Sequence, residues 1–204
     1  MLLKVCGLTT AADAVHAAAA GATAVGVIFA PASPRCVTAD RARDIVRALP
    51  PELPVVGVFV DATLAEIVAT VAHTGIRVVQ LHGDEPESYA AALKMPLVRA
   101  ATVDVAAESW PKALLLLDAV SGRQRGGTGT RVDWQQAAAI ARRRKVVLAG
   151  GLTPDNVAEA VATVRPYGVD VSSGVEDAPG RKNPDKVSRF LEEARAAFAR
   201  NEDR

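Results

Sequence analysis

The sequence predicts a (β/α)8 barrel, in which eight parallel strands form a ring and a layer of helices surrounds it. Eight short apolar runs recur along the 204 residues, nearly continuous in Val, Leu and Ile. Runs of this kind are typical of parallel strands that helices cover. Most segments between them have helical periodicity, and polar side chains collect where the runs end. Strand and helix therefore alternate eight times, which is the pattern of a barrel.

The predicted strands follow one another without a linker or a low-complexity segment. They are the runs at residues 2–6, 24–30, 55–60, 77–82, 97–102, 114–119, 146–150 and 169–173. An open, doubly wound sheet is the alternative fold, because five or six strands would also alternate with helices. The length suits one domain, and we expect residues 1–204 to form a single barrel domain.

The helices between these runs have recognisable ends. Thr10 is expected to cap the first helix, and Gly21 is expected to end it. Thr38 and Asp61 precede the periodic apolar residues of the second and third helices, so each is a candidate N-cap. Pro184 suits the first turn of the last helix. Residues 103–113 break the pattern, and we expect a reduced helix after the fifth strand.

Composition excludes several classes of function. The 24 basic and 23 acidic residues give a net charge of +1, without the basic face of a nucleic-acid-binding protein. Two cysteines, Cys6 and Cys36, and three well separated histidines offer neither a disulfide framework nor the spacing of a metal site. With no signal peptide or membrane span in the sequence, we expect a cytoplasmic protein with no membrane partner.

Polar residues at the ends of the predicted strands indicate an active-site rim, because barrel enzymes place their chemistry at the C-terminal ends of the strands. These residues are Cys6, Gln80, His82, Asp118, Asp170 and Ser172. The two-residue period of a strand also places Lys4 on the same face as Cys6, and Gln80 on the same face as His82.

Three glycine-rich stretches, RGGTGTRVDW, AGGLTPDN and DVSSGVE, lie at or after the last three runs and each leads into a helix. Backbone N–H groups and helix N-termini at this position form the phosphate site of many barrels. The sequence therefore favours a phosphorylated small molecule as ligand.

Cys6 and Asp118 are candidates for acid–base chemistry. A thiol has an ordinary pKa near 8.5, and a nearby Lys4 ammonium would lower the pKa of Cys6 toward that of a usable base. Asp118 follows four leucines, and apolar surroundings favour the protonated form that a general acid needs. A base and an acid on different strands suit an isomerase that opens a sugar ring and moves a proton.

Seven motifs in order, spread over nearly the whole chain, resemble those of phosphoribosylanthranilate isomerases. They are KVCGLT, GVIFAPASPRCVT, VVQLHGDE, LLLLDA, GGTGTRVDW, VLAGGLTPDNV and GVDVSSGVE. The resemblance implies a (β/α)8 barrel without a cofactor that acts in tryptophan biosynthesis. It implies an Amadori rearrangement of N-(5-phosphoribosyl)anthranilate to 1-(2-carboxyphenylamino)-1-deoxyribulose 5-phosphate.

The resemblance also implies roles for single residues. Cys6 would be the general base, Asp118 the general acid and Arg35 the ligand of the anthranilate carboxylate. Gln80, His82 and Asp170 would line the pocket and position the substrate. The phosphate would be bound by Gly127, Thr128, Gly129, Gly150, Gly151, Ser173 and Gly174. The partner would be a small phosphoribosyl molecule, and the sequence is compatible with a monomer or a homodimer.

Other functions fit the motifs less well. The dual-substrate isomerase of histidine and tryptophan synthesis has similar phosphate loops, but it uses an aspartate at the end of the first strand, where this chain has Cys6. A catalytically idle phosphoribosyl-binding protein would be expected to lack Cys6 or Asp118. One position departs from the family pattern: Asn183 stands where an acidic residue is usual, although an asparagine can still cap the last helix.

Overall fold

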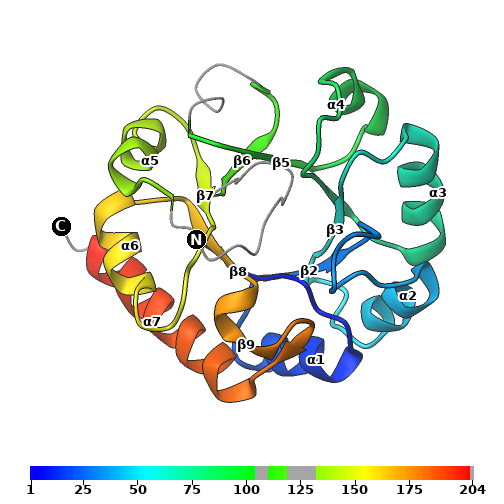
Figure 1. The fold of residues 1–204 in the computed structure, drawn as a ribbon. Helices are drawn as coiled ribbons and strands as arrows, with labels where there is room; N and C mark the ends of the chain where they lie inside the picture. Colours follow the sequence, from blue (N-terminus) through cyan, green and yellow to red (C-terminus); the bar gives the residue numbers. More distant parts are fainter. Residues whose placement is uncertain (104–109, 119–131, 203–204) are drawn as a thin grey trace.

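The computed structural model describes residues 1–103, 110–118 and 132–202. Eight parallel strands close into a barrel in the order β1 to β8, and β1 pairs with β8 to complete the ring (Figure 1). The strands are β1 (Leu2–Val5), β2 (Ala24–Ile28), β3 (Val55–Phe59), β4 (Val78–Leu81), β5 (Leu97–Ala101), β6 (Leu114–Leu117), β7 (Val146–Leu148) and β8 (Gly168–Val171). The closed barrel confirms the predicted fold class and excludes the open sheet.

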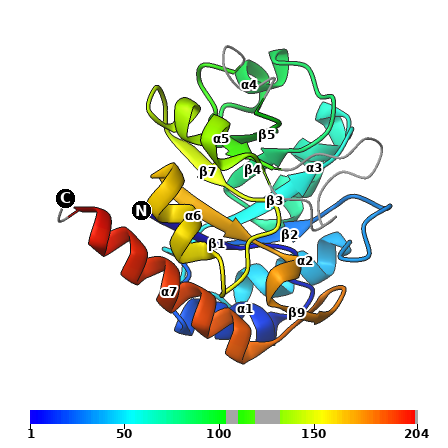
Figure 2. The same cartoon turned by 60° about the vertical axis from the view of Figure 1, so that its left-hand side comes forward.

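Helices surround the ring of strands (Figure 1). They are α1 (Ala11–Ala19), α2 (Ala39–Arg47), α3 (Leu64–Thr74), α4 (Ser88–Leu93), α5 (Trp134–Ala141), α6 (Val157–Val164) and α7 (Pro184–Glu202). A short 3-10 turn, η1 (Ser173–Val175), and a hairpin of β9 (Glu176–Ala178) and β10 (Arg181–Lys182) lie between β8 and α7. The long α7 packs against both α6 and α1 (Figure 2). No helix in the described ranges is long and apolar enough to cross a membrane.

Side chains define the helix ends, as the sequence predicts at Thr10 and Thr38. Each hydroxyl accepts a hydrogen bond from a backbone N–H of the first turn of α1 or α2. The predicted cap of the third helix is wrong. Thr63, not Asp61, caps α3, because it forms a reciprocal capping box with Glu66. Asp61 lies two residues earlier in the left-handed region, with φ of 54°.

The segment between β5 and β6 lies partly outside the described residues, and the predicted reduced helix falls mostly on 104–109. Residues 102–103 and 110–113 are not helical. Trp110 is buried, and the Arg99 guanidinium lies over its ring, 5.0 Å from the centroid. Arg144 donates hydrogen bonds to the carbonyls of Trp110 and Ala113. The described part of this connection is thus held by side-chain contacts.

The interior of the barrel divides into an apolar and a polar part. An apolar cluster comes from β5, β6 and the β7 region, with Val98, Ala100, Leu116, Val147 and Ala149 buried. The buried polar side chains Lys4, Gln80 and Asp170 come from β1, β4 and β8. A polar group is buried at low cost only where it is hydrogen-bonded. The side of the interior that holds these three residues is therefore the candidate functional region.

Candidate active site

A buried hydrogen-bond chain crosses the barrel interior. The Lys4 ammonium donates to Asp170 Oδ2 at 2.9 Å and to Gln80 Oε1 at 3.0 Å. Because β1 and β4 are not neighbours in the ring, the contact between Lys4 and Gln80 spans the barrel. Burial opposes the charged form of Lys4, but its acidic neighbours, Asp170 foremost, hold its pKa above the ordinary value. Lys4 is therefore a permanent cation beneath the strand ends.

The same chain continues to His82 and Asp118. Lys4 offers only donors, so it fixes Oε1 of Gln80 as the acceptor and leaves the amide Nε2 to donate to His82 Nδ1, 3.1 Å away. A neutral His82 must then carry its proton on Nε2. That atom is 3.5 Å from Asp118 Oδ2 and makes no hydrogen bond within the described part of the chain. In this tautomer the Nε2–H group of His82 points toward Asp118, the predicted general acid.

Cys6 directly follows β1 and is 5% exposed. Gly26 on the neighbouring strand makes room for it, since a Cβ at that position would lie 2.7 Å from the sulfur. Burial raises the pKa of the Cys6 thiol above its ordinary value, and the favourable charge of Lys4 only partly offsets this. The expectation that Lys4 brings the thiol pKa below normal is therefore wrong, because desolvation outweighs the attraction.

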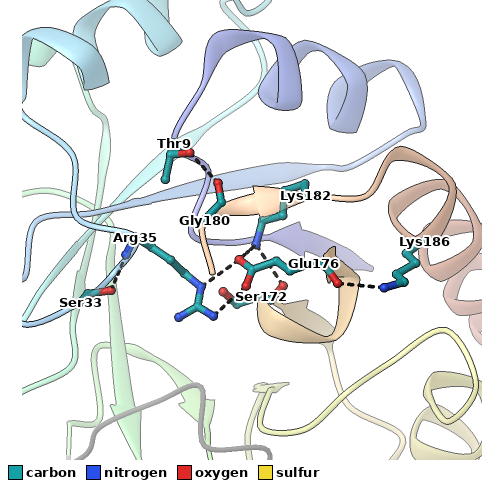
Figure 3. A network of polar contacts seen from close by, with 8 residues as sticks. All are labelled: Thr9, Ser33, Arg35, Ser172, Glu176, Gly180, Lys182 and Lys186. Carbon is teal, nitrogen blue, oxygen red and sulfur yellow. Dashed lines mark hydrogen bonds and ion pairs between the residues drawn. The ribbon is translucent and has the colours of Figure 1, made fainter. Parts of the chain in front are cut away.

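Arg35, in the loop after β2, faces an acidic partner that the sequence analysis did not assign. Its Nε and Nη2 donate to the two carboxylate oxygens of Glu176, and Lys182 donates to the same carboxylate (Figure 3). Glu176 closes the GVDVSSGVE motif. In the sequence, Glu176 is a motif residue without an assigned role. Its partner Arg35 is far away along the chain, so no local pattern reveals the pair.

The loops after β7 and β8 meet backbone to backbone. A Cβ on Gly174 would lie 1.9 Å from the Leu152 carbonyl oxygen, so only glycine allows this approach. Asn156 shapes the first of the two loops: its Oδ1 accepts from Thr153 N at 2.8 Å and its Nδ2 donates to Gly151 O at 2.9 Å. Sequence reasoning assigned Asn156 no role.

Predicted phosphate ligands are only partly described. Gly150, Gly151, Ser173 and Gly174 lie in these two adjacent loops. Gly127, Thr128 and Gly129 lie outside the described residues. The role of all seven in phosphate binding stays a prediction.

Glu85 of the VVQLHGDE motif supports the loop after β4. Glu85 accepts hydrogen bonds from the backbone N–H groups of Gly83 and Asp61, each at 2.8 Å, and from Arg99 at 2.9 Å. This loop begins directly after His82. Glu85 therefore orients the segment that carries the histidine, and its motif position has a structural reason.

The structure brings together four of the six residues predicted to catalyse the reaction or bind the substrate outside the phosphate loops. Gln80, His82 and Asp118 form one chain with Lys4 and Asp170, whereas Arg35 belongs to the separate cluster with Glu176. Asp170 keeps Oδ1 without a hydrogen bond among the described residues, so it can accept one from a ligand hydroxyl. Over the same ranges, no group of three His, Cys, Asp or Glu side chains is placed to hold a metal ion.

Comparison with known proteins gives a consistent result. The family model for N-(5'-phosphoribosyl)anthranilate (PRA) isomerase matches residues 3–193. The N-(5'-phosphoribosyl)anthranilate isomerase of Geobacter sp. (strain M21) is 46% identical over 198 residues, which cover 95% of this chain and 97% of the relative.

Solved structures agree with this result. The phosphoribosylanthranilate isomerase of Thermotoga maritima superposes with a TM-score of 0.89 at 35% identity, covering 96% of this chain and all of that one. A phosphoribosylanthranilate isomerase in complex with reduced 1-(o-carboxyphenylamino)-1-deoxyribulose 5-phosphate gives a TM-score of 0.85 at 34% identity, with the same coverage. By sequence and by fold, this chain belongs to the N-(5'-phosphoribosyl)anthranilate isomerase family.

Proposed function

We propose that this chain catalyses the Amadori rearrangement of N-(5'-phosphoribosyl)anthranilate in tryptophan biosynthesis, with Cys6 as general base and Asp118 as general acid. The observation that carries the assignment is the pairing of a thiol and a carboxyl group that directly follow β1 and β6, at the catalytic end of the barrel. Both are largely buried, and the side chains of Lys4, Gln80 and His82 lie between them.

The reaction divides into four proton movements. The Asp118 carboxyl group donates its proton to the furanose ring oxygen, the C1–O bond breaks, and the nitrogen lone pair forms a Schiff base. The Cys6 thiolate then removes the proton from C2, and the electrons of that bond form an enolamine. Loss of the enol proton and protonation at C1 give the ketone, so the overall reaction consumes no proton.

The neighbours of the two groups have supporting roles in this proposal. Nε2–H of His82 faces Asp118, so it would stabilise the carboxylate that ring opening leaves behind. Asp170 Oδ1 would accept a hydrogen bond from a sugar hydroxyl. Arg35 would bind the anthranilate carboxylate, and the glycine loops would bind the phosphate. Gln80, which Lys4 and His82 already engage, would act on the substrate through His82.

The test follows the decay of substrate fluorescence after phosphoribosylanthranilate is generated in the cuvette. The wild-type protein should accelerate the decay well above background, and no acceleration would contradict the proposed reaction. Asp118→Asn keeps the shape of the side chain but removes its proton donor, so turnover should fall about 10²–10⁴-fold. Asp44→Asn, on the exposed face of α2, is the matched control and should turn over normally. A near-normal Asp118→Asn enzyme would overturn the acid assignment.

We propose in addition that the chain acts in the cytoplasm, as a monomer or a homodimer. Both of its cysteines are free thiols, which is usual for proteins of reducing compartments. Light scattering coupled to size-exclusion chromatography distinguishes the two assembly states.

A further inference from the structure

We propose that Glu176 and Lys182, both in the β9–β10 hairpin, are positioning residues that orient Arg35 toward the aromatic carboxylate of the substrate. The inference rests on the proposed function, which gives Arg35 that ligand. Neither residue is expected to touch the substrate. Instead, Glu176 and Lys182 would determine which edge of the Arg35 guanidinium faces the substrate carboxylate.

The hydrogen bonds of Arg35 define this edge. Nε donates to Glu176 Oε1 at 2.8 Å, and Nη2 donates to Oε2 at 2.7 Å, so Glu176 occupies one side of the planar guanidinium. A guanidinium has five donors in a rigid plane. The edge formed by Nη1 and the second hydrogen of Nη2 is left for another carboxylate, which it matches in a bidentate geometry.

Glu176 is itself held in place. Lys182 donates to Glu176 Oε1 at 2.7 Å and to the Ser172 carbonyl at 3.0 Å, while Lys186 donates to the Glu176 carbonyl at 2.9 Å (Figure 3). The side chains of Glu176 and Lys182 are 4% and 2% exposed. Because buried contacts fix the Glu176 carboxylate, its position sets the orientation of the Arg35 guanidinium.

The charges of the cluster favour an anion as its missing partner. Burial alone would raise the pKa of the Glu176 carboxyl, but the hydrogen bonds from Arg35 and Lys182 outweigh it and hold the pKa below the usual range. Glu176 is therefore ionised between Arg35 and Lys182. Burial lowers the pKa of Lys182, but the hydrogen bond to Glu176 opposes this shift, and the ionised cluster has one net positive charge. A substrate carboxylate at the free edge of Arg35 would balance that charge.

Two glycines fix the cluster relative to the catalytic strand. A Cβ on Gly7 would lie 2.6 Å from Cδ of Arg35, so the arginine stem crosses directly over the residue that follows Cys6. On the other side, Thr9 donates a hydrogen bond to the Gly180 carbonyl at 2.6 Å, which ties the hairpin turn to the loop after β1. The stem of Arg35 and the hairpin turn are thereby both packed against the loop that follows the proposed base.

The experiment measures how much the enzyme gains from the ligand's carboxylate. Two inhibitors are compared by calorimetry: reduced 1-(o-carboxyphenylamino)-1-deoxyribulose 5-phosphate and the same compound without the carboxylate. In the wild-type protein the carboxylated inhibitor should bind about tenfold to hundredfold more tightly. Glu176→Gln keeps the side-chain size but removes the negative charge and turns one of the two acceptor oxygens of Arg35 into an NH2 donor, so it should abolish most of this preference. The affinity for the inhibitor without a carboxylate should change little.

The control and a second variant separate this role from simple loss of structure. Asp177→Asn removes a charge from the next residue, which pairs with Lys186 at the surface, and it should keep the wild-type preference. Glu176→Asp retains the charge if Glu176→Gln does not fold, and its shorter side chain should still reduce the preference severalfold. Full retention of the preference in a folded Glu176 variant would overturn the inference. A wild-type protein without any preference would instead overturn the proposed role of Arg35.

Discussion

At the scale of single residues, Cys6 has two properties that oppose each other. As a general base Cys6 must act in its thiolate form, but the buried site of Cys6 excludes the water that would stabilise a thiolate. The cations near it, Lys4 and Lys182, favour the thiolate, yet burial has the larger effect and raises the pKa of the thiol. The free enzyme therefore holds Cys6 mainly as the neutral thiol at pH 7.

This thiol can be titrated directly, because the chain has only two cysteines. In a Cys36→Ala background, the ultraviolet absorbance of the thiolate should appear with a midpoint above the ordinary thiol pKa of about 8.5. The double variant Cys6→Ser/Cys36→Ala supplies the baseline. A midpoint below 8.5, the value of an unperturbed thiol, would show that the nearby cations and not burial dominate.

At the scale of elements, the sequence predicts the strands better than the turns around them. Apolar runs identify all eight barrel strands, because each strand is buried on both faces. The cap of α3 was misplaced because Asp61 and Thr63 are both good capping residues, and periodicity does not decide between candidates two positions apart. Asp61 instead accepts a hydrogen bond from Asp84 N at 2.6 Å, in the loop after the next strand.

The close contact between the loops after β7 and β8 predicts the effect of Gly174→Ala. The added methyl group would collide with the Leu152 carbonyl, so the two loops must separate. Inhibition by inorganic phosphate, followed in the fluorescence assay, should weaken about tenfold to hundredfold, the cost of losing a hydrogen bond to a charged group.

Gly75→Ala is the matched control for this change. Gly75 ends α3 with φ of 78°, so the substitution should cost about 1 kcal/mol of unfolding free energy without affecting phosphate. Equal inhibition constants for wild-type and Gly174→Ala enzymes would show that these loops do not bind the phosphate.

At the scale of the whole molecule, the pattern of strands and helices is enough to predict the barrel, because few folds accommodate eight such repeats. The side-chain contacts across the barrel interior cannot be predicted from this pattern. Lys4 and Gln80 lie 76 positions apart and Arg35 and Glu176 lie 141 apart. Such pairs depend on the barrel's register and radius, which no local pattern contains. Cys6 and Asp118 were predictable as strand-end residues, whereas the partners that orient Arg35 were not.

Breaking the buried pair of Lys4 and Asp170 should be costly, because the remaining partner would lose its counterion. Lys4→Met leaves the Asp170 carboxylate buried without its cation, and the free energy of unfolding in urea at pH 8 should fall by about 3–5 kcal/mol. Replacing both residues, as Lys4→Met/Asp170→Leu, removes the uncompensated charge and should recover most of this loss. A single variant that loses less than about 1 kcal/mol would show that Asp170 is not left as an uncompensated buried charge.

The position of this ion pair has a consequence for the order of folding. Lys4 and Asp170 lie 166 positions apart, on the two strands that meet where the ring closes. The Lys4 ammonium thus has its counterion, and with it a fixed place under Cys6, only after the last strand has joined the first. A partly assembled barrel can contain most of its core and still have no ordered site. The appearance of activity during refolding would therefore report the closure of the ring rather than the formation of helices.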